Sequence, residues 1–334
     1  MRLTRLTASV AVTLALAGTV TACAAPQMAP KLQLRAASAR LDGPQGGVTL
    51  SFTGDLDALT GAANRVRTRE HVGKMDASTA RIYEKIFGST LTIRYDKGAD
   101  GNADESFGLA ATVAGIEGTE LRVVKGVVYA KAPVEDLAVQ FGGNRASVRN
   151  LAAAAGSNAG VRAALSGRWI AIKLSDLTKD LTNAGGPLAG MPGLTVPARG
   201  TLTDAQLAGF SAAMDELFTK ASITRDDNDS SHLVATVTEK DLYATLQKLA
   251  AATSPGLGSS LKDLVGKSAA PTAKKIAVDL WITDGTLKAV EINLVQLSST
   301  NSPGRAALRI EPIKPAAVTA PTGAVTLDLG SLTN

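Results

Sequence analysis

Residues 276–295 read IAVDLWITDGTLKAVEINLV and carry the clearest fold signal in the chain. Ile276–Thr283 and Leu287–Val295 are expected to be two long strands. Asp284-Gly285-Thr286 joins the two stretches, and an Asp-Gly pair at this point is a hairpin signal. A hairpin connection makes the two strands antiparallel.

The same pattern of short strands joined by tight turns recurs along the chain. Glu120–Val124 and Val127–Lys131 flank Lys125-Gly126, a two-residue hairpin loop. Ser222–Arg225 and His232–Val237 flank a run of aspartate and asparagine that also indicates a turn. Continued over the whole sequence, the pattern predicts about ten or eleven strands with amphipathic helices between them.

These connections predict the fold class. Hairpins give antiparallel neighbours, which excludes a doubly wound βαβ arrangement. A sheet of this width twists and curls, and its inner face needs an apolar cover. The helical segments are the available cover. We therefore predict an α+β fold, a curved antiparallel half-barrel sheet of about 10–11 strands with helices packed on the concave face.

The N-terminus has the layout of an export signal that ends in a lipidation site. Arg2 and Arg5 precede an apolar run, Ala8–Val20, which is too short to cross a hydrocarbon core of about 30 Å. The run ends in Val20-Thr21-Ala22-Cys23, which resembles the lipobox of bacterial lipoproteins. Cys23 is the only cysteine in the chain. We therefore expect cleavage before Cys23 and acylation of its thiol, for example with palmitate. The alternative is an ordinary secretory signal followed by a chance cysteine.

Composition narrows the range of partners. The chain has 35 basic and 30 acidic residues, and the expected signal removes two of the basic ones, so the mature protein carries only a mild positive charge. Aromatic residues make up 4% of the chain, which does not favour a stacking platform for single strands. We therefore expect no nucleic-acid partner. With its single cysteine acylated the chain forms no internal disulfide, so the core must supply its stability.

Motifs that would indicate catalysis or metal binding are incomplete. His71 and His232 lack HExxH spacing, and solvated or capping roles are favoured for both. Ser259-Ser260-Leu261-Lys262 has SxxK spacing without the partner motifs of penicillin-binding enzymes. Gly256-Leu257-Gly258 lacks the third glycine of a dinucleotide loop. Asp96, Asp100, Asp104 and Glu105 are not spaced as an EF-hand, so a solvated turn is favoured over Ca²⁺ binding. We expect neither an enzyme nor a cofactor or metal site.

The order of the strand segments after a lipobox resembles the LolA-like lipoproteins of actinobacteria, the LppX/LprG-type group. The resemblance rests on residues 121–131, 167–172, 219–225, 232–238 and 278–292. It implies a half-open antiparallel barrel, helices on the concave face and a hydrophobic cavity for lipid acyl chains. It also implies an actinobacterial source.

The resemblance and the signal together give a domain plan. This chain is longer than the family core, mainly around Ala58–Ala80 and Thr182–Gly200. We expect residues 1–22 to be the lipoprotein signal peptide, 23–37 a lipidated tether, 38–312 the LolA-like lipid-carrier domain and 313–334 a Pro-rich C-terminal tail. The protein would be anchored to the cell membrane by its lipid, facing outside the cytoplasm.

Apolar helical faces supply the candidate binding residues. The same periodicity fits two roles, filling the core or lining a lipid cavity. The Gly- and Pro-rich segment Gly185–Gly200 is the candidate gate. The candidate cavity-lining residues are Leu207, Phe210, Met214, Phe218, Leu242 and Leu246.

The leading hypothesis is an envelope lipoprotein that binds or carries a lipid or other amphiphile in a hydrophobic cavity. Its partners would be the membrane through Cys23, the cargo and an envelope transporter. The alternative is a non-catalytic envelope protein whose curved sheet is a docking surface for another protein. A hydrolase would require distant groups such as His71, His232 and a serine to meet in one pocket.

Overall fold

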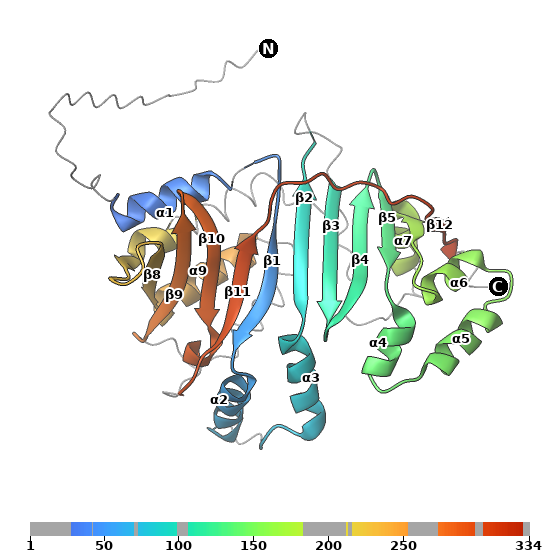
Figure 1. The fold of residues 1–334 in the computed structure, drawn as a ribbon, viewed down its shortest axis with the longest axis horizontal. Coiled ribbons are helices and arrows are strands. Elements are labelled where there is room, and N and C mark those ends of the chain that lie inside the picture. The colour runs from blue at the N-terminus through green and yellow to red at the C-terminus, as the bar shows by residue number, and fades with distance from the viewer. Residues whose placement is uncertain are drawn as a thin grey trace, which may run out of the picture.

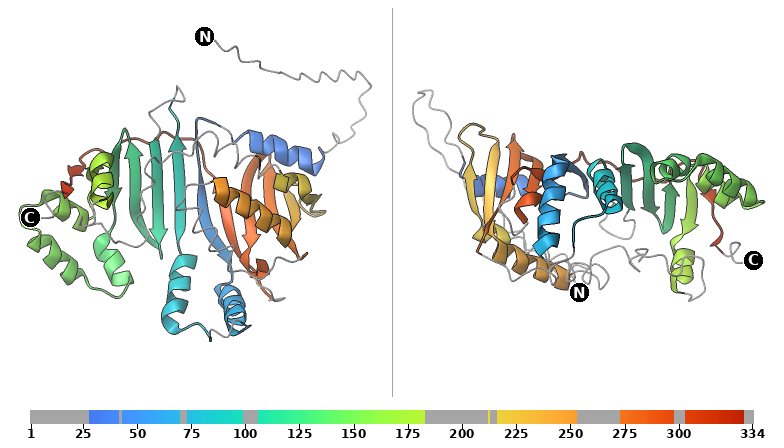
Figure 2. Two further views of the ribbon diagram at one scale, coloured as in Figure 1. Left: turned by 180° about the vertical axis from the view of Figure 1, so that it is seen from behind. Right: turned by 90° about the horizontal axis from the view of Figure 1, so that it is seen from below.

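A computed structural model describes residues 28–41, 43–69, 73–98, 106–182, 212, 216–252, 273–297 and 303–329. These residues form one curved twelve-stranded sheet with helices on one of its faces and along its edges (Figures 1 and 2). No helix within these ranges is long and apolar enough to cross a membrane.

The strands occur in the order β12-β6-β5-β4-β3-β2-β1-β11-β10-β9-β8-β7 across the sheet. Every neighbouring pair is antiparallel except β12 and β6, which are parallel. The strands are β1 Gln45–Gly54, β2 Thr90–Asp96, β3 Ser106–Val113, β4 Ile116–Val124, β5 Val127–Lys131, β6 Ile170–Lys173, β7 Ser222–Arg225, β8 His232–Thr238, β9 Lys275–Thr283, β10 Thr286–Asn293, β11 Ala306–Pro312 and β12 Val325–Thr326.

Two meanders, joined at the centre, make the sheet. Strands β1 to β5 follow one another as neighbours, and so do β7 to β11. Strand β11 then pairs with β1 over seven residues, with Leu50 opposite Ile310. This long-range pairing makes one continuous sheet from the N-terminal and C-terminal halves of the chain.

Most helices lie at the ends of strands or over one face of the sheet (Figure 2). Several of them begin beside a capping side chain. The Asp76 carboxylate accepts the Thr79 N–H at 2.7 Å, and the Thr238 hydroxyl accepts the Asp241 N–H at 3.1 Å. The helices are α1 Pro30–Ala39, α2 Leu56–Arg69, α3 Ala77–Phe87, α4 Val134–Gln140, α5 Arg145–Ala154, α6 Ala159–Leu165, α7 Leu174–Thr182, α9 Glu239–Ala252 and the 3₁₀ turn η1 Leu294–Leu297.

The register of the strands separates an apolar face from a polar one. Residues directly opposite each other in antiparallel strands lie on the same side of a sheet. Leu280 of β9 is opposite Val290 and Leu233, and this alternation continues without a change of side through β1 to β5. One face is therefore apolar across the whole sheet, and the other carries most of the charged strand residues.

The buried core lies on the apolar face, under the helices. Leu34 and Ala37 of α1 pack on Leu280 and Ile282, while Leu177 of α7 packs on the far end of the sheet. Helix α2 contributes a third group beside β11. All three helices thus cover the same face, as the prediction of helices on the concave side requires.

The fold-class prediction is confirmed: the protein is α+β with a curved, unclosed and mostly antiparallel sheet. Twelve strands replace the expected ten or eleven. Helix α2 occupies the first part of the segment Ala58–Ala80, where the chain is longer than the family core, and its Ala58 and Ala62 pack against Ala306 and Val295. From Pro30 onward the expected tether is helix α1.

The segment expected as a Pro-rich tail contributes to the sheet. After β11 it crosses the upper end of the sheet, where Thr319 O accepts a hydrogen bond from Arg122 at 3.1 Å (Figure 1). It then adds β12 beside β6, with Val325 N donating to Trp169 O and Leu327 N to Ala171 O, each at 2.9 Å. Local sequence gave no signal for this strand because its partner is more than 150 residues away.

Candidate functional site

The candidate site is the central part of the apolar face, which we call the central apolar face. This face is buried toward both ends of the sheet: Leu233 and Ile276, in β8 and β9, are 0% and 1% exposed, and Val128, in β5, is 7% exposed. Over the five central strands the side chains are only half-buried, and Phe107 is 38% exposed. The central apolar face consists of Leu308 and Ile310 of β11, Val48, Leu50 and Phe52 of β1, Leu91 and Ile93 of β2, Phe107 and Leu109 of β3, and Leu121 and Val123 of β4.

The register of five strands builds this surface. Leu50 lies opposite both Ile310 and Leu91, and Ile93 lies opposite both Val48 and Leu109. With neighbouring strands about 4.8 Å apart, the surface is about 20 Å wide. Its positions carry aliphatic and aromatic side chains without a charge, so its chemistry favours apolar ligands.

Aromatic contacts mark two margins of the central apolar face. Phe52 stacks on Phe87 of α3, with ring centroids 5.8 Å apart and an interplanar angle of 25°. At the other end of β2 the Tyr95 hydroxyl donates to Leu41 O at 3.4 Å, just after α1. The surface therefore extends between the edge of the sheet near α1 and the edge at α3.

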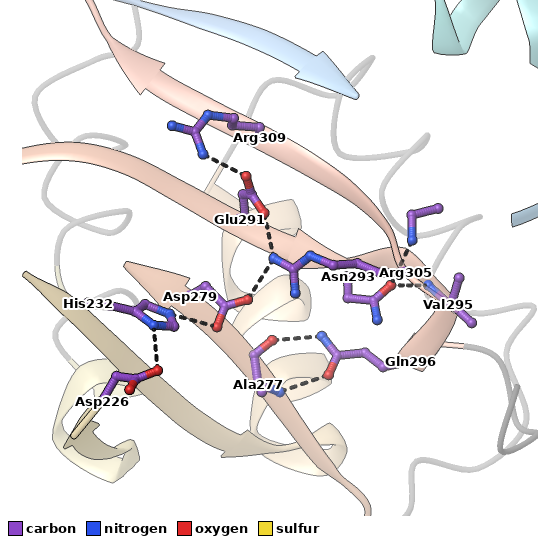
Figure 3. Close-up of polar contacts among 11 residues, drawn as sticks. Asp226, His232, Ala277, Asp279, Glu291, Asn293, Val295, Gln296, Arg305 and Arg309 are labelled. Carbon is purple, nitrogen blue, oxygen red and sulfur yellow. Dashed lines mark hydrogen bonds and ion pairs between the residues drawn. The ribbon is translucent and has the colours of Figure 1, made fainter. Parts of the chain in front are cut away.

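The opposite face has a different chemistry, shown by a network of ion pairs on β8 to β11 (Figure 3). His232 Nδ1 lies 3.2 Å from Asp226 Oδ2, and His232 Nε2 lies 3.1 Å from Asp279 Oδ1. Arg305 bridges Asp279 and Glu291. Arg309 pairs with Glu291 at 2.6 Å, which extends the network across four strands, β8 to β11.

The electrostatics of this network are those of structural ion pairs. Glu291 is 7% exposed. Burial alone would raise the pKa of Glu291, but hydrogen bonds from Arg305 and Arg309 outweigh it and hold the pKa below its usual 4.5. The Asn228 N–H, and then His232, lower the pKa of Asp226. Both ring nitrogens of His232 are occupied by carboxylates, so neither faces a serine that it could activate.

His232 therefore has a role that the sequence did not indicate. We expected it to be solvated or to cap a turn, whereas it lies between two aspartates and against Trp281. The second aspartate, Asp279, is 47 residues away in the chain, so no local pattern reveals it. Among the residues that the structure describes, no group of three or more His, Cys, Asp or Glu is placed to hold a metal ion.

Two of the six candidate cavity residues have described side chains. Phe218 packs against the core beneath α1, and Leu242 against Ala221, Val237 and Ile276. Both contribute to the covered end of the sheet and lie apart from the central apolar face. Leu246 belongs to α9, with its side chain outside the described set. The candidates Leu207, Phe210 and Met214 lie outside the described residues.

Several other sequence candidates also fall outside the described residues. They are the lipidation site Cys23, the segment Gly185–Gly200, His71, the Gly256–Gly258 and Ser259–Lys262 motifs, and the acids Asp100, Asp104 and Glu105. Asp96 is described, and its carboxylate accepts hydrogen bonds from Gln45 and from the Gly98 N–H.

Sequence reasoning missed the central apolar face as a site, although the signal was present. Val48, Leu50 and Phe52 alternate with threonine and serine in β1, and Leu91 and Ile93 do so in β2. The candidate binding residues predicted from the sequence lie on expected helical faces instead. The pairing of β1 with β11 places the strand residues on one surface.

Comparison with known proteins gives a distant structural likeness. The chain is similar to the crystal structure of the Mycobacterium tuberculosis lipoprotein LppX, with 11% sequence identity and a TM-score of 0.31. The match covers 87% of this chain and 96% of that one. A scan against protein-family models and a search of curated proteins gave no match.

Proposed function

We propose that this protein is a lipid-anchored envelope lipoprotein that holds a lipid or other amphiphile against its central apolar face. The observation that carries the proposal is the partial exposure of an uncharged, apolar surface about 20 Å wide. Such a surface in contact with water is either a binding site or a site of aggregation, because soluble proteins rarely expose large continuous apolar patches.

The binding chemistry is burial of apolar surface. An acyl chain that leaves water for the central apolar face gains about 25 cal/mol for each Å² buried. No bond is made or broken, and no cofactor is required. Partly exposed aromatic side chains such as Phe107 supply wide contacts with few rotamers to order.

The anchor is proposed from sequence. Acylation at Cys23 would hold the domain at the outer side of the cytoplasmic membrane, where lipids and other amphiphiles are available. Two or three acyl chains give stable attachment, at about 0.8 kcal/mol for each buried CH₂. Mass spectrometry of the intact protein from its native membrane tests this part separately: an unmodified Cys23 would contradict it.

Cargo is tested on the mature chain with Cys23→Ser, expressed in a bacterial periplasm, so that any extracted lipid is cargo and not anchor. We expect a lipid near one mole per mole of protein in the organic extract. Leu50→Glu should remove it, because the substitution places a charge in the central apolar face.

Ser51→Glu is the matched control. Ser51 follows Leu50 in β1 but lies on the polar face, opposite Arg309. It should retain the lipid, and thermal unfolding shows whether each variant is folded. An empty extract from the folded parent, with no rise in Tm on adding lipids, would reject the carrier and leave the docking protein as the function to test.

A further inference from the structure

We infer that helix α1 lies on the bilayer surface, with Met28 and Leu32 inserted among the lipid headgroups. The inference deepens the proposed function and rests on its lipid anchor at Cys23. It concerns the outer side of α1, which is separate from the central apolar face.

Helix α1 has two apolar sides, and the sheet covers only one of them. Leu34 and Ala37 are buried against β9 and β10. Leu32 lies on the other side of the helix and is 57% exposed, and Met28, two residues before the helix begins, is 53% exposed. Ala36 and Ala39 continue the exposed side toward the end of the helix. An exposed apolar stripe on a helix is typical of contact with a membrane interface or a partner.

The charges beside the stripe fit an anionic lipid surface. Lys31, Arg35 and Arg40 are exposed, and residues 28–41 contain no acid. Lys31 and Arg40 also donate to the carbonyls of Thr219 and Asp284, which fixes both ends of α1 to the domain. The helix and the sheet are thus held together as one surface.

A nearby acidic turn limits the electrostatic part of this contact. Arg225 donates to Met28 O at 2.9 Å and so brings the β7–β8 turn close to the start of α1. That turn carries three aspartates, of which Asp226 contacts His232. The apolar stripe must therefore supply most of the attraction, and the three basic residues add to it.

Chain length explains why the bilayer is the occupant of this surface. Five peptide steps separate Cys23 from Met28, so a fully extended chain reaches about 17 Å. An acylated Cys23 therefore keeps the start of α1 within that distance of the lipid. This confinement raises the effective concentration of the bilayer at the stripe, so that a weak contact is populated.

The position of α1 also orients the domain. Arg40 reaches the β9–β10 turn, whereas α3 lies at the opposite ends of the strands (Figure 1). The strands are about 25 Å long, so α3 would point away from the membrane. There Ile82 and Ile86 are 53% and 49% exposed, which makes them a matched control pair on the distal edge.

The test attaches one saturated alkyl chain to Cys23 of the mature protein with a thiol-reactive maleimide. Cys23 is the only cysteine, so the chain is attached at the anchor position alone. A single chain binds membranes marginally, at about 10⁴ M⁻¹, which leaves a contribution from α1 measurable. Partition is measured with vesicles of phosphatidylglycerol and phosphatidylcholine.

Met28→Glu with Leu32→Glu should weaken partition about tenfold or more, because two apolar contacts are replaced by charges that an anionic surface repels. Ile82→Glu with Ile86→Glu should leave partition unchanged. Lys31→Gln with Arg35→Gln should weaken it on anionic vesicles only, and high salt should remove that difference.

Equal partition of the α1 variant and the parent would overturn the inference. A loss confined to the α3 variant would also overturn it and would assign the membrane side to the opposite edge. The attached chain makes the result independent of cellular acylation and of cargo, so failure of the proposed function remains distinguishable. Thermal unfolding confirms that the exposed substitutions leave each variant folded.

Discussion

The imidazole of His232 lies flat on the indole of Trp281, with ring centroids 4.8 Å apart and an interplanar angle of 7°. The two residues are directly opposite each other in β8 and β9. The Arg309 guanidinium is 5.3 Å from the centroid of the same indole. Trp281 therefore links β8, β9 and β11 on the polar face, beside the ion pairs of Glu291.

The stacked pair should show a measurable coupling. In a double-mutant cycle of His232→Ala and Trp281→Ala, we expect a coupling free energy of unfolding of about 1 kcal/mol, as for other stacked ring pairs. Urea unfolding measures it. Additive effects within error would mean that the stack contributes nothing beyond each residue's own contacts.

Glu291 should be the most sensitive member of the ion-pair network. Glu291→Gln leaves Arg305 and Arg309 without the buried charge that they share, so we expect a loss of about 3 kcal/mol in the free energy of unfolding. Glu311→Gln is the control, because Glu311 pairs with the same Arg309 and its side chain is 42% exposed. Its expected cost is below about 1 kcal/mol. Similar losses in the two variants would contradict the assignment.

The same network predicts how the free energy of unfolding changes at low pH. The pKa of Glu291 is lower in the folded protein than its usual 4.5, so the unfolded chain binds the proton more readily. Its contribution is complete above pH 4.5 and is lost as the pH falls through the folded pKa. Unfolding free energies measured from pH 6 downward should fall less steeply for Glu291→Gln than for the parent. Parallel curves would count against this linkage.

The tail should contribute to stability through its contact with α6. A Cβ on Gly160 would lie 2.8 Å from both Cα and Cδ1 of Leu327, so Gly160→Ala should displace β12 and lower Tm. Alanine is otherwise the better helix former by about 1 kcal/mol. In a chain truncated after Lys314, the same substitution should therefore be neutral or stabilising. A lower Tm in both the full and the truncated chain would mean that the clash does not involve the tail.

Sequence alone was sufficient for most of the strands and their turns, but it did not indicate β12. The two strand segments that form β9 and β10, with Asp284-Gly285 between them, predict a hairpin because the geometry of a tight turn is local. The helix starts at Asp76 and Thr238 are local features of the same kind, since a cap and its amide are only three residues apart.

Tertiary structure alone decided which strands are neighbours and which helix faces are covered. Alternation fixes a face but not a partner, so the pairing of Leu50 with Ile310 and the addition of β12 to β6 could not be inferred from local pattern. Periodicity likewise marked Phe218 and Leu242 as apolar but could not say that they pack against the core. The central apolar face exists because β11 and β1 meet, and that depends on contacts between residues more than 250 positions apart.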